Sequence, residues 1–421
     1  MSTASSPKQG GGKGIPWYAS IIPLNMAVGA SSVLSTLVAL SLGASVAEIG
    51  LMTSSGAVVT IIFSTVWGKL SDRSRLRKRY LLIIFFLLGP MFLVLSTASS
   101  VPQLILYYTL LSVLTSGITP IAVMYSVETS RGKNWQGEVA RFNSISSLGN
   151  ILGFAMNTFV ALFFRINWLF YISSALCFVE ALLFWQIAEE TSITLERHAF
   201  PILHLRDAER LFSLRSIFHY LDIRQLQIPR SLKQLKPLHL LFLACFIHWT
   251  GVFFFSVGQT PLMKDLGLSN SIILAINVSA SAVPVITFSK IAPSLKKDRK
   301  RIINTAIFSR GFLMLCWGAL PIFLIHPFPY VFVFPLLFSI LFPFFYSILW
   351  LPITTFAISS APKNNKGSAQ GELLSAMAIA KAFGSALGGL VMATMGYTVG
   401  FVIAAIISVV AAPVISRINM I

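Results

Sequence analysis

The chain has 421 residues, of which 55% are hydrophobic and 11% are charged, and its mean hydropathy is +0.78. Because soluble globular domains carry about 25% charged residues, this composition excludes a soluble globular protein. The net charge of +18 is spread over short segments between apolar runs and forms no concentrated stripe, so we expect contacts with anionic lipid headgroups and no nucleic-acid partner.

Residues 1–14 begin the chain as a polar tail without the apolar region and small-residue cleavage site of a signal peptide, so we expect a flexible tail. About twelve apolar segments of spanning length follow, since roughly 20 residues cross a ~30 Å hydrocarbon core. They are too long for barrel strands, and helices leave no backbone group unpaired in lipid. The predicted fold is an all-α membrane protein with twelve transmembrane helices, centred near residues 30, 57, 88, 113, 150, 177, 249, 280, 312, 342, 383 and 405.

Basic residues alternate between the gaps that separate these segments. The gap from Lys69 to Arg79 holds six, residues 189–236 hold eight, and Lys296 to Arg301 hold five. The intervening gaps hold only Arg165 and Lys264. Because Lys and Arg are retained on the cytoplasmic side, this pattern predicts a multi-pass protein of the plasma membrane with both termini in the cytoplasm.

The two halves of the chain resemble each other. Gln136-Gly137-Glu138 recurs 234 residues later as Gln370-Gly371-Glu372, and Gly149-x-x-x-Gly153 recurs as Gly384-x-x-x-Gly388. We therefore predict two six-helix bundles as parallel repeats, with a binding site between them near the midplane. The bundles would span residues 15–188 and 237–421, and residues 189–236 would link them through cytoplasmic amphipathic helices.

The gap after the second segment reads Gly68-Lys69-Leu70-Ser71-Asp72-Arg73-Ser74-Arg75-Leu76-Arg77-Lys78-Arg79. It resembles the signature of the major facilitator superfamily, a family of twelve-helix transporters that work by alternating access. Arg75 stands where the family has its second Gly, and Leu76 where it has the next Arg.

The resemblance implies a cytoplasmic latch that closes against the start of helix 11. In the family, this latch is formed by the Asp that corresponds to Asp72, a base of the loop and an acid at the end of helix 4. Glu128, just before Arg131, is the candidate for that acid. Which base completes the latch stays open between Arg75 and Arg77, whereas Lys78 and Arg79 are expected only to set topology. The expected gate residues are Gly68, Asp72, Arg73, Arg75, Arg77, Glu128, Arg131 and Gly371.

Proton-coupled drug antiporters of this superfamily carry a Pro after the Gly-x-x-x-Gly step of helix 5. Here Phe154 follows Gly153, which weakens an antiporter assignment. Segments 1, 4, 7 and 10 also have no Asp or Glu near their middle, where a proton-coupled transporter usually needs a titrating carboxylate. Proton coupling would then depend on His248, Lys381 or Glu180.

Polar residues inside the spans are the candidate substrate ligands, because an ionisable group in lipid is expensive. Lys381 would attract an anionic substrate or form a salt bridge to a neighbouring helix. Asn143, Asn150 and Asn157 share one face of helix 5 and would line the cavity or bond to a partner helix. The other candidates are Asn25, His248, Gln259, Asn277, Tyr346 and Trp350, whereas Glu180 and Arg310 are interpreted as structural pairs or snorkelling groups.

The sequence carries no Walker loop, metalloprotease motif or nucleophile elbow, so we expect no enzymatic activity, no cofactor and no metal site. The predicted function is secondary active transport of a small organic solute, anionic or amphipathic, by a monomer in the lipid bilayer. Proton-coupled multidrug efflux is one alternative, with the proton as coupling ion. A non-transporting sensor or lipid-handling protein on a transporter fold is another.

Overall fold

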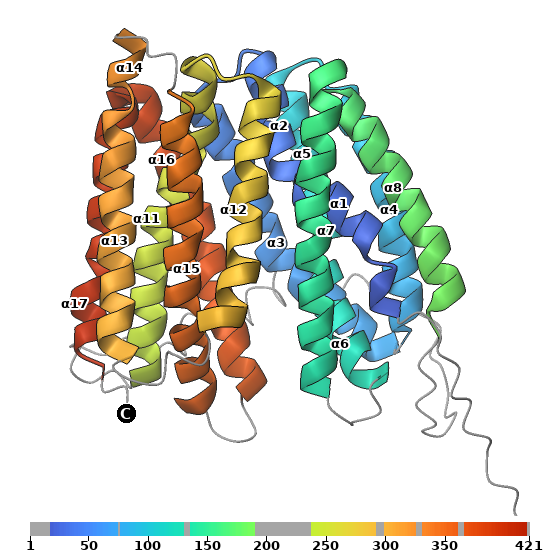
Figure 1. Cartoon of the computed structure of the whole chain (residues 1–421). Coiled ribbons are helices and arrows are strands. Elements are labelled where there is room, and N and C mark those ends of the chain that lie inside the picture. The colour runs from blue at the N-terminus through green and yellow to red at the C-terminus, as the bar shows by residue number, and fades with distance from the viewer. Residues whose placement is uncertain are drawn as a thin grey trace, which may run out of the picture.

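The computed structural model describes residues 17–74, 76–129, 135–189, 237–291, 299–325, 331–360 and 366–418, and the regular structure of these residues is entirely helical. The expected tail of residues 1–14 and the linker of residues 190–236 lie outside the described residues. The helices of each half lie together, with the blue-to-green half beside the yellow-to-red half (Figure 1).

The first half begins with a broken helix, because Pro23 follows a short 3₁₀ turn and the backbone bends again at Ala30. Its elements are η1 (Trp17–Ala19), α1 (Ile22–Gly29), α2 (Ser31–Ser41), α3 (Val46–Ser74), α4 (Arg77–Ser96), α5 (Val101–Thr115), α6 (Ile118–Thr129), α7 (Trp135–Phe163) and α8 (Trp168–Ile187).

The second half ends in a predominantly apolar helical stretch of 46 residues, Gly371–Ser416. An unbroken helix of that length would extend about 69 Å, more than twice the hydrocarbon core. The backbone leaves the helical conformation once, at Gly396, whose φ of 84° suits glycine. The elements are α11 (Pro237–Asp265), α12 (Asn270–Ile291), α13 (Arg299–Ala319), α14 (Ile322–Ile325), α15 (Val333–Ser360), α16 (Lys366–Val409) and α17 (Ala411–Ser416).

Eleven helical stretches of the described residues are long and apolar enough to cross a membrane, and the last of them is the 46-residue stretch. The prediction of an all-helical, membrane-spanning chain is confirmed. The expected eleventh and twelfth segments, centred near residues 383 and 405, both fall in this last stretch, on either side of Gly396.

Glycines of α7 let it approach α1 closely. A Cβ built on Gly149 would lie 2.6 Å from the Cβ of Asn25, and one on Gly153 would lie 2.4 Å from the carbonyl oxygen of Met26. Larger residues would force the two helices apart, because such distances are well inside van der Waals contact.

The same contact recurs in the second half between α16 and α11. A Cβ on Gly384 would lie 3.2 Å from the Cβ of Phe253, and one on Gly388 would lie 2.5 Å from the carbonyl oxygen of Phe254. The two glycines of α16 lie 235 residues after those of α7, and their contact residues on α11 lie 228 residues after those on α1. The repeat seen in the sequence therefore has a matching repeat of helix packing.

In each half a lysine at the start of one helix, α4 or α13, caps the end of the last helix, α8 or α17. Lys78 donates to the carbonyl oxygens of Trp185 at 3.1 Å and Ala188 at 2.5 Å, whereas Lys300 donates to that of Ser416 at 2.6 Å. A cation there satisfies orphan carbonyls and opposes the negative end of the helix dipole. Lys78 therefore does more than the topology-setting role expected of it.

The two halves touch through α3 and α16. A Cβ on Gly50 would lie 2.5 Å from the Ser385 carbonyl oxygen and 2.8 Å from the Gly389 Cα, and Ser54 donates to the Ala382 carbonyl oxygen at 2.8 Å. This contact lies toward the base-poor face, the end where α3 begins after the gap at residues 42–45.

At the opposite, base-rich face the same two helices have space around them. The Cβ positions of Gly68 on α3 and Gly371 on α16 have no atom of the described residues within 4 Å. Since α3 and α16 meet at one end and leave these glycines uncovered at the other, the described halves are in a conformation joined at the base-poor face.

Candidate functional site

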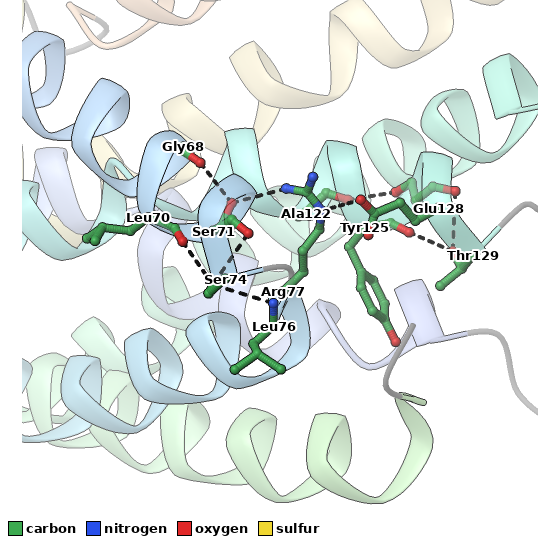
Figure 2. A network of polar contacts seen from close by, with 11 residues as sticks. Gly68, Leu70, Ser71, Ser74, Leu76, Arg77, Ala122, Tyr125, Glu128 and Thr129 are labelled. Carbon is green, nitrogen blue, oxygen red and sulfur yellow. Dashed lines mark hydrogen bonds and ion pairs between the residues drawn. The ribbon is translucent and has the colours of Figure 1, made fainter. Parts of the chain in front are cut away.

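The sequence motif between α3 and α4 forms a buried polar contact at the base-rich face (Figure 2). Arg77 is 5% exposed, and its Nε donates to Glu128 Oε1 of α6 at 2.6 Å while Nη1 donates to Ser71 Oγ of α3 at 3.0 Å. The chain turns at Leu76, where φ and ψ of −100° and 56° end the helical path, so Arg77 enters α4 pointing back between α3 and α6.

Arg77 is therefore the base that pairs with the acid singled out in the sequence, Glu128. Arg73 is exposed, and the Asp72 side chain, Arg75 and Arg131 lie outside the described residues. Among the described atoms none lies within 4 Å of the Cβ position of Gly371, at the start of α16.

Lys381 lies in the middle of α16, fifteen residues from both Lys366 and Gly396, or about 22 Å from each at 1.5 Å per residue. The most exposed apolar residues nearby, Phe383 and Leu390, project about 160–180° around the helix from it. Lys381 is thus on the face that packs toward α11 and α3. Among the described residues its Nζ has no hydrogen-bond or ion-pair partner, and it lies 6.0 Å from the centre of the Phe253 ring.

Beside Lys381, α11, α12 and α15 contribute an aromatic cluster whose centre is Trp249. The ring centroid of Trp249 lies 5.7 Å from Phe253, 5.7 Å from Tyr346 and 6.1 Å from Trp350. Tyr346 and Trp350 are stacked at 6.1 Å with an interplanar angle of 20°, and Phe288 adds an edge contact at 6.0 Å. We refer to Trp249, Phe253, Phe288, Tyr346 and Trp350 as the aromatic cluster.

A second cation, Arg310 of α13, lies behind this cluster and is only 2% exposed. Its guanidinium carbon is 4.1 Å from the ring centre of Phe342, 5.2 Å from that of Trp249 and 5.9 Å from that of Tyr346. Cations are stabilised on such ring faces. Within the part of the chain that the structure describes, Arg310 has no carboxylate partner and its Nε has no acceptor.

Arg310 also fixes the state of His248. Its Nη1 lies 2.9 Å from His248 Nε2, and His248 Nδ1 lies 2.9 Å from Ser408 Oγ. Because arginine can only donate, Nε2 accepts and the ring proton is on Nδ1, which leaves His248 neutral in this arrangement. His248 and Arg310 form a structural pair. For Arg310 the sequence left a structural pair or a snorkelling group as alternatives, and its buried side chain does not snorkel.

The first half has a matching polar pair. Ser20 Oγ donates to Glu180 Oε1 at 3.4 Å, and this pair is separated by 160 residues in the chain, as are His248 and Ser408. Glu180 is fully buried and its Oε2 has no partner among the described residues. The two halves thus bury an equivalent polar pair, in which Ser20 corresponds to His248 and Glu180 to Ser408.

The asparagines of α7 have different surroundings. Asn143 is exposed, the Asn150 side chain fills the space over Gly29 of α1, and Asn157 is fully buried with no partner for its amide among the described residues. Asn25 donates to its own helix at the Ile21 carbonyl and reaches Ser146 Oγ of α7 at 3.4 Å. The stripe therefore faces α1 at Asn150 and does not form one continuous lining.

Two further candidates stand apart from these groups. Asn277 donates to the Ile273 carbonyl of its own helix at 2.8 Å, and Gln259 is half-buried in α11. The sequence analysis did not include Arg310 or Trp249 among the candidate substrate ligands. The signal that could have identified Arg310 was an ionisable residue well inside an apolar segment, whereas nothing in the sequence indicates that Trp249 contacts Phe253, Tyr346 and Trp350.

Comparison with known proteins agrees with this architecture. The family model described as Major Facilitator Superfamily matches residues 19–371. No curated protein matches the sequence.

Among solved structures, an auto-inhibited peptide transporter of the POT family is similar at 14% identity, with a TM-score of 0.72 and coverage of 96% of this chain and 98% of that one. A D-xylose–proton symporter has a TM-score of 0.69 at 15% identity, covering 95% and 96%. The human organic anion transporter MFSD10 has 0.63 at 14%, covering 95% and 97%. At these identities the structures share the fold alone, and together with the family model they show that this chain is a membrane transporter of the major facilitator superfamily.

Proposed function

We propose that this protein is a secondary active transporter of a small organic anion. The observation that carries the proposal is the pair of cations in the second half: Lys381 faces the interior of the fold and Arg310 lies behind the aromatic cluster, and neither has a carboxylate partner among the described residues. A charge in a low-dielectric interior is costly unless a counter-charge is supplied. An anionic substrate would supply it directly to Lys381, near the midplane, and would also be attracted by the charge of Arg310 behind the cluster.

Transport would proceed by alternating access between the two halves. The contact between Gly50 and Gly389 closes the base-poor face, and its separation would open that face while the motif around Arg77 closes the other. In this proposal the chain crosses the plasma membrane twelve times as a monomer, with the break at Gly396 dividing the last two crossings and both termini in the cytoplasm. Residues 15–188 and 237–421 form the two moving bundles.

A second candidate is proton-coupled transport, and the buried carboxyl of Glu180 favours it. Its Oε2 has no hydrogen-bond donor among the described residues, and a carboxyl in such a place can hold a proton. Uptake that is driven by a pH gradient in wild type and lost in Glu180→Gln would support this candidate.

The test is counterflow in liposomes containing the purified full-length protein. The probes are lactate, benzoate and succinate as anions, glucose as a neutral solute and tetraphenylphosphonium as a lipophilic cation. We expect saturable counterflow of at least one anion, reduced at least tenfold by Lys381→Gln. The matched control is Lys264→Gln, because Lys264 is exposed at the base-poor face and bonds only to Asn270 among the described residues.

Counterflow of the cation or of glucose, unaffected by Lys381→Gln, would refute the anion proposal, and counterflow of the cation would favour the multidrug alternative. Absence of counterflow for every solute would favour a non-transporting sensor or lipid-handling role on this fold.

A further inference from the structure

We infer that the anion this protein carries is aromatic, a small aryl carboxylate whose charge pairs with Lys381 and whose ring packs on the aromatic cluster. This inference rests on the proposed function and names its substrate class. It depends on the side chains that surround Lys381, and neither the sequence motif nor membership of the family determines these.

The first argument is the position of Lys381 relative to the rings. Its Nζ is 6.0 Å from the centre of Phe253, and Phe253 contacts Trp249 at 5.7 Å. A carboxylate bound to this ammonium would have its substituent within reach of Phe253. An aromatic surface is therefore available to the substituent.

The second argument is that part of the cluster is uncovered. Phe253, Tyr346 and Trp350 are half-buried, whereas Trp249 is 6% exposed. On α15, Leu337 and Phe344 are exposed and lie about 160–180° around the helix from Tyr346. The accessible parts of Tyr346 and Trp350 thus face the interior of the fold.

The third argument is the stack of Tyr346 and Trp350, two half-buried rings 6.1 Å apart that give one more ring an aromatic surface to pack on. Aromatic pairs prefer offset-stacked or edge-to-face geometry with centroids 4.5–7 Å apart, and they gain affinity beyond the area they bury. A saturated ring of the same size would bury similar area without this gain. The site should distinguish the two.

The fourth argument is electrostatic. Arg310 occupies faces of Trp249 and Tyr346 from behind and is too buried to touch a solute. Its charge without a carboxylate partner adds to the positive potential at the cluster, so an anion gains there and an aromatic cation loses. This arrangement separates aryl anions from the lipophilic cations that aromatic cavities otherwise accept.

The test measures Kd by isothermal titration calorimetry on the purified full-length protein with benzoate, cyclohexanecarboxylate and benzylamine. Benzoate and cyclohexanecarboxylate share charge and size and differ in aromaticity. We expect benzoate to bind about tenfold more tightly than cyclohexanecarboxylate, and benzylamine not to bind. Trp350→Leu should abolish the preference while cyclohexanecarboxylate keeps its Kd, and Trp350→Phe should retain part of the preference.

Equal affinity for the two acids, with both lost in Lys381→Gln, would overturn the aromatic inference and leave the anion proposal standing. Binding of benzylamine in place of either acid would overturn both. If Trp350→Leu does not yield folded protein, the comparison of the two acids on wild type and on Trp350→Phe still decides the matter.

Discussion

Gly389→Ala should shift the protein toward a conformation in which the base-poor face is open. The added Cβ would lie 2.7 Å from the Val46 carbonyl oxygen and 2.8 Å from the Gly50 Cα, and both are backbone atoms that no rotamer change can move. Such overpacking costs about 1–3 kcal/mol. Because the cost applies only while α3 and α16 touch, the ratio of open to closed base-poor face should rise about 5- to 150-fold.

The control is Gly371→Ala on the same helix, where the added Cβ meets nothing within 4 Å. Both substitutions gain similar helix propensity, so the difference between them isolates the contact. Spin labels at Ser41 and Thr394, both exposed toward the base-poor face, report the separation of the halves by double electron–electron resonance in a cysteine-free background. Identical distance distributions for the two variants would refute the reasoning that this contact holds the face closed.

Three further predictions concern buried polar groups, and each is measured as a thermal unfolding midpoint in detergent. Arg77→Met should destabilise by about 3–5 kcal/mol because it removes the buried cation that pairs with the Glu128 carboxylate, whereas Glu128→Gln should cost less because its amide oxygen still accepts; equal losses would contradict this account. His248→Leu and Arg310→Met should each cost about 1–3 kcal/mol by orphaning the other, and the double variant should recover part of that sum. Strict additivity would argue that the 2.9 Å contact contributes nothing. Glu180→Gln should be tolerated, whereas Glu180→Leu should cost about 0.5–1.5 kcal/mol because it removes the 3.4 Å contact with Ser20, whose hydroxyl keeps the Trp17 carbonyl as an acceptor at 2.7 Å; equal midpoints for the two variants would count against a contribution from this contact.

Local features of the sequence predicted a large part of this molecule. Spanning length and apolar composition predicted helices along the chain, and the motif from Gly68 to Arg79 indicated the family, because both depend on residues that are close in sequence. The repeat of small residues has a counterpart in the helix packing. It appears as α7 on α1 and α16 on α11.

The sequence was less informative where partners come from distant helices. It left Arg75 and Arg77 as equal candidates for the latch, and only the turn at Leu76 shows Arg77 between Ser71 and Glu128. Gly396 is another case, since one residue's φ divides a 46-residue apolar stretch and its composition does not show it.

By itself, then, the sequence determined that the protein lies in a membrane, that it is helical and to which family it belongs, since hydropathy, helix length and a contiguous motif are local properties of the chain. Tertiary structure alone decided the surroundings of its charges. Lys381, Arg310 and the aromatic cluster come from α11, α12, α13, α15 and α16, and their meeting depends on how these helices cross. Long-range packing sets such contacts, and with them the chemistry that the site can recognise.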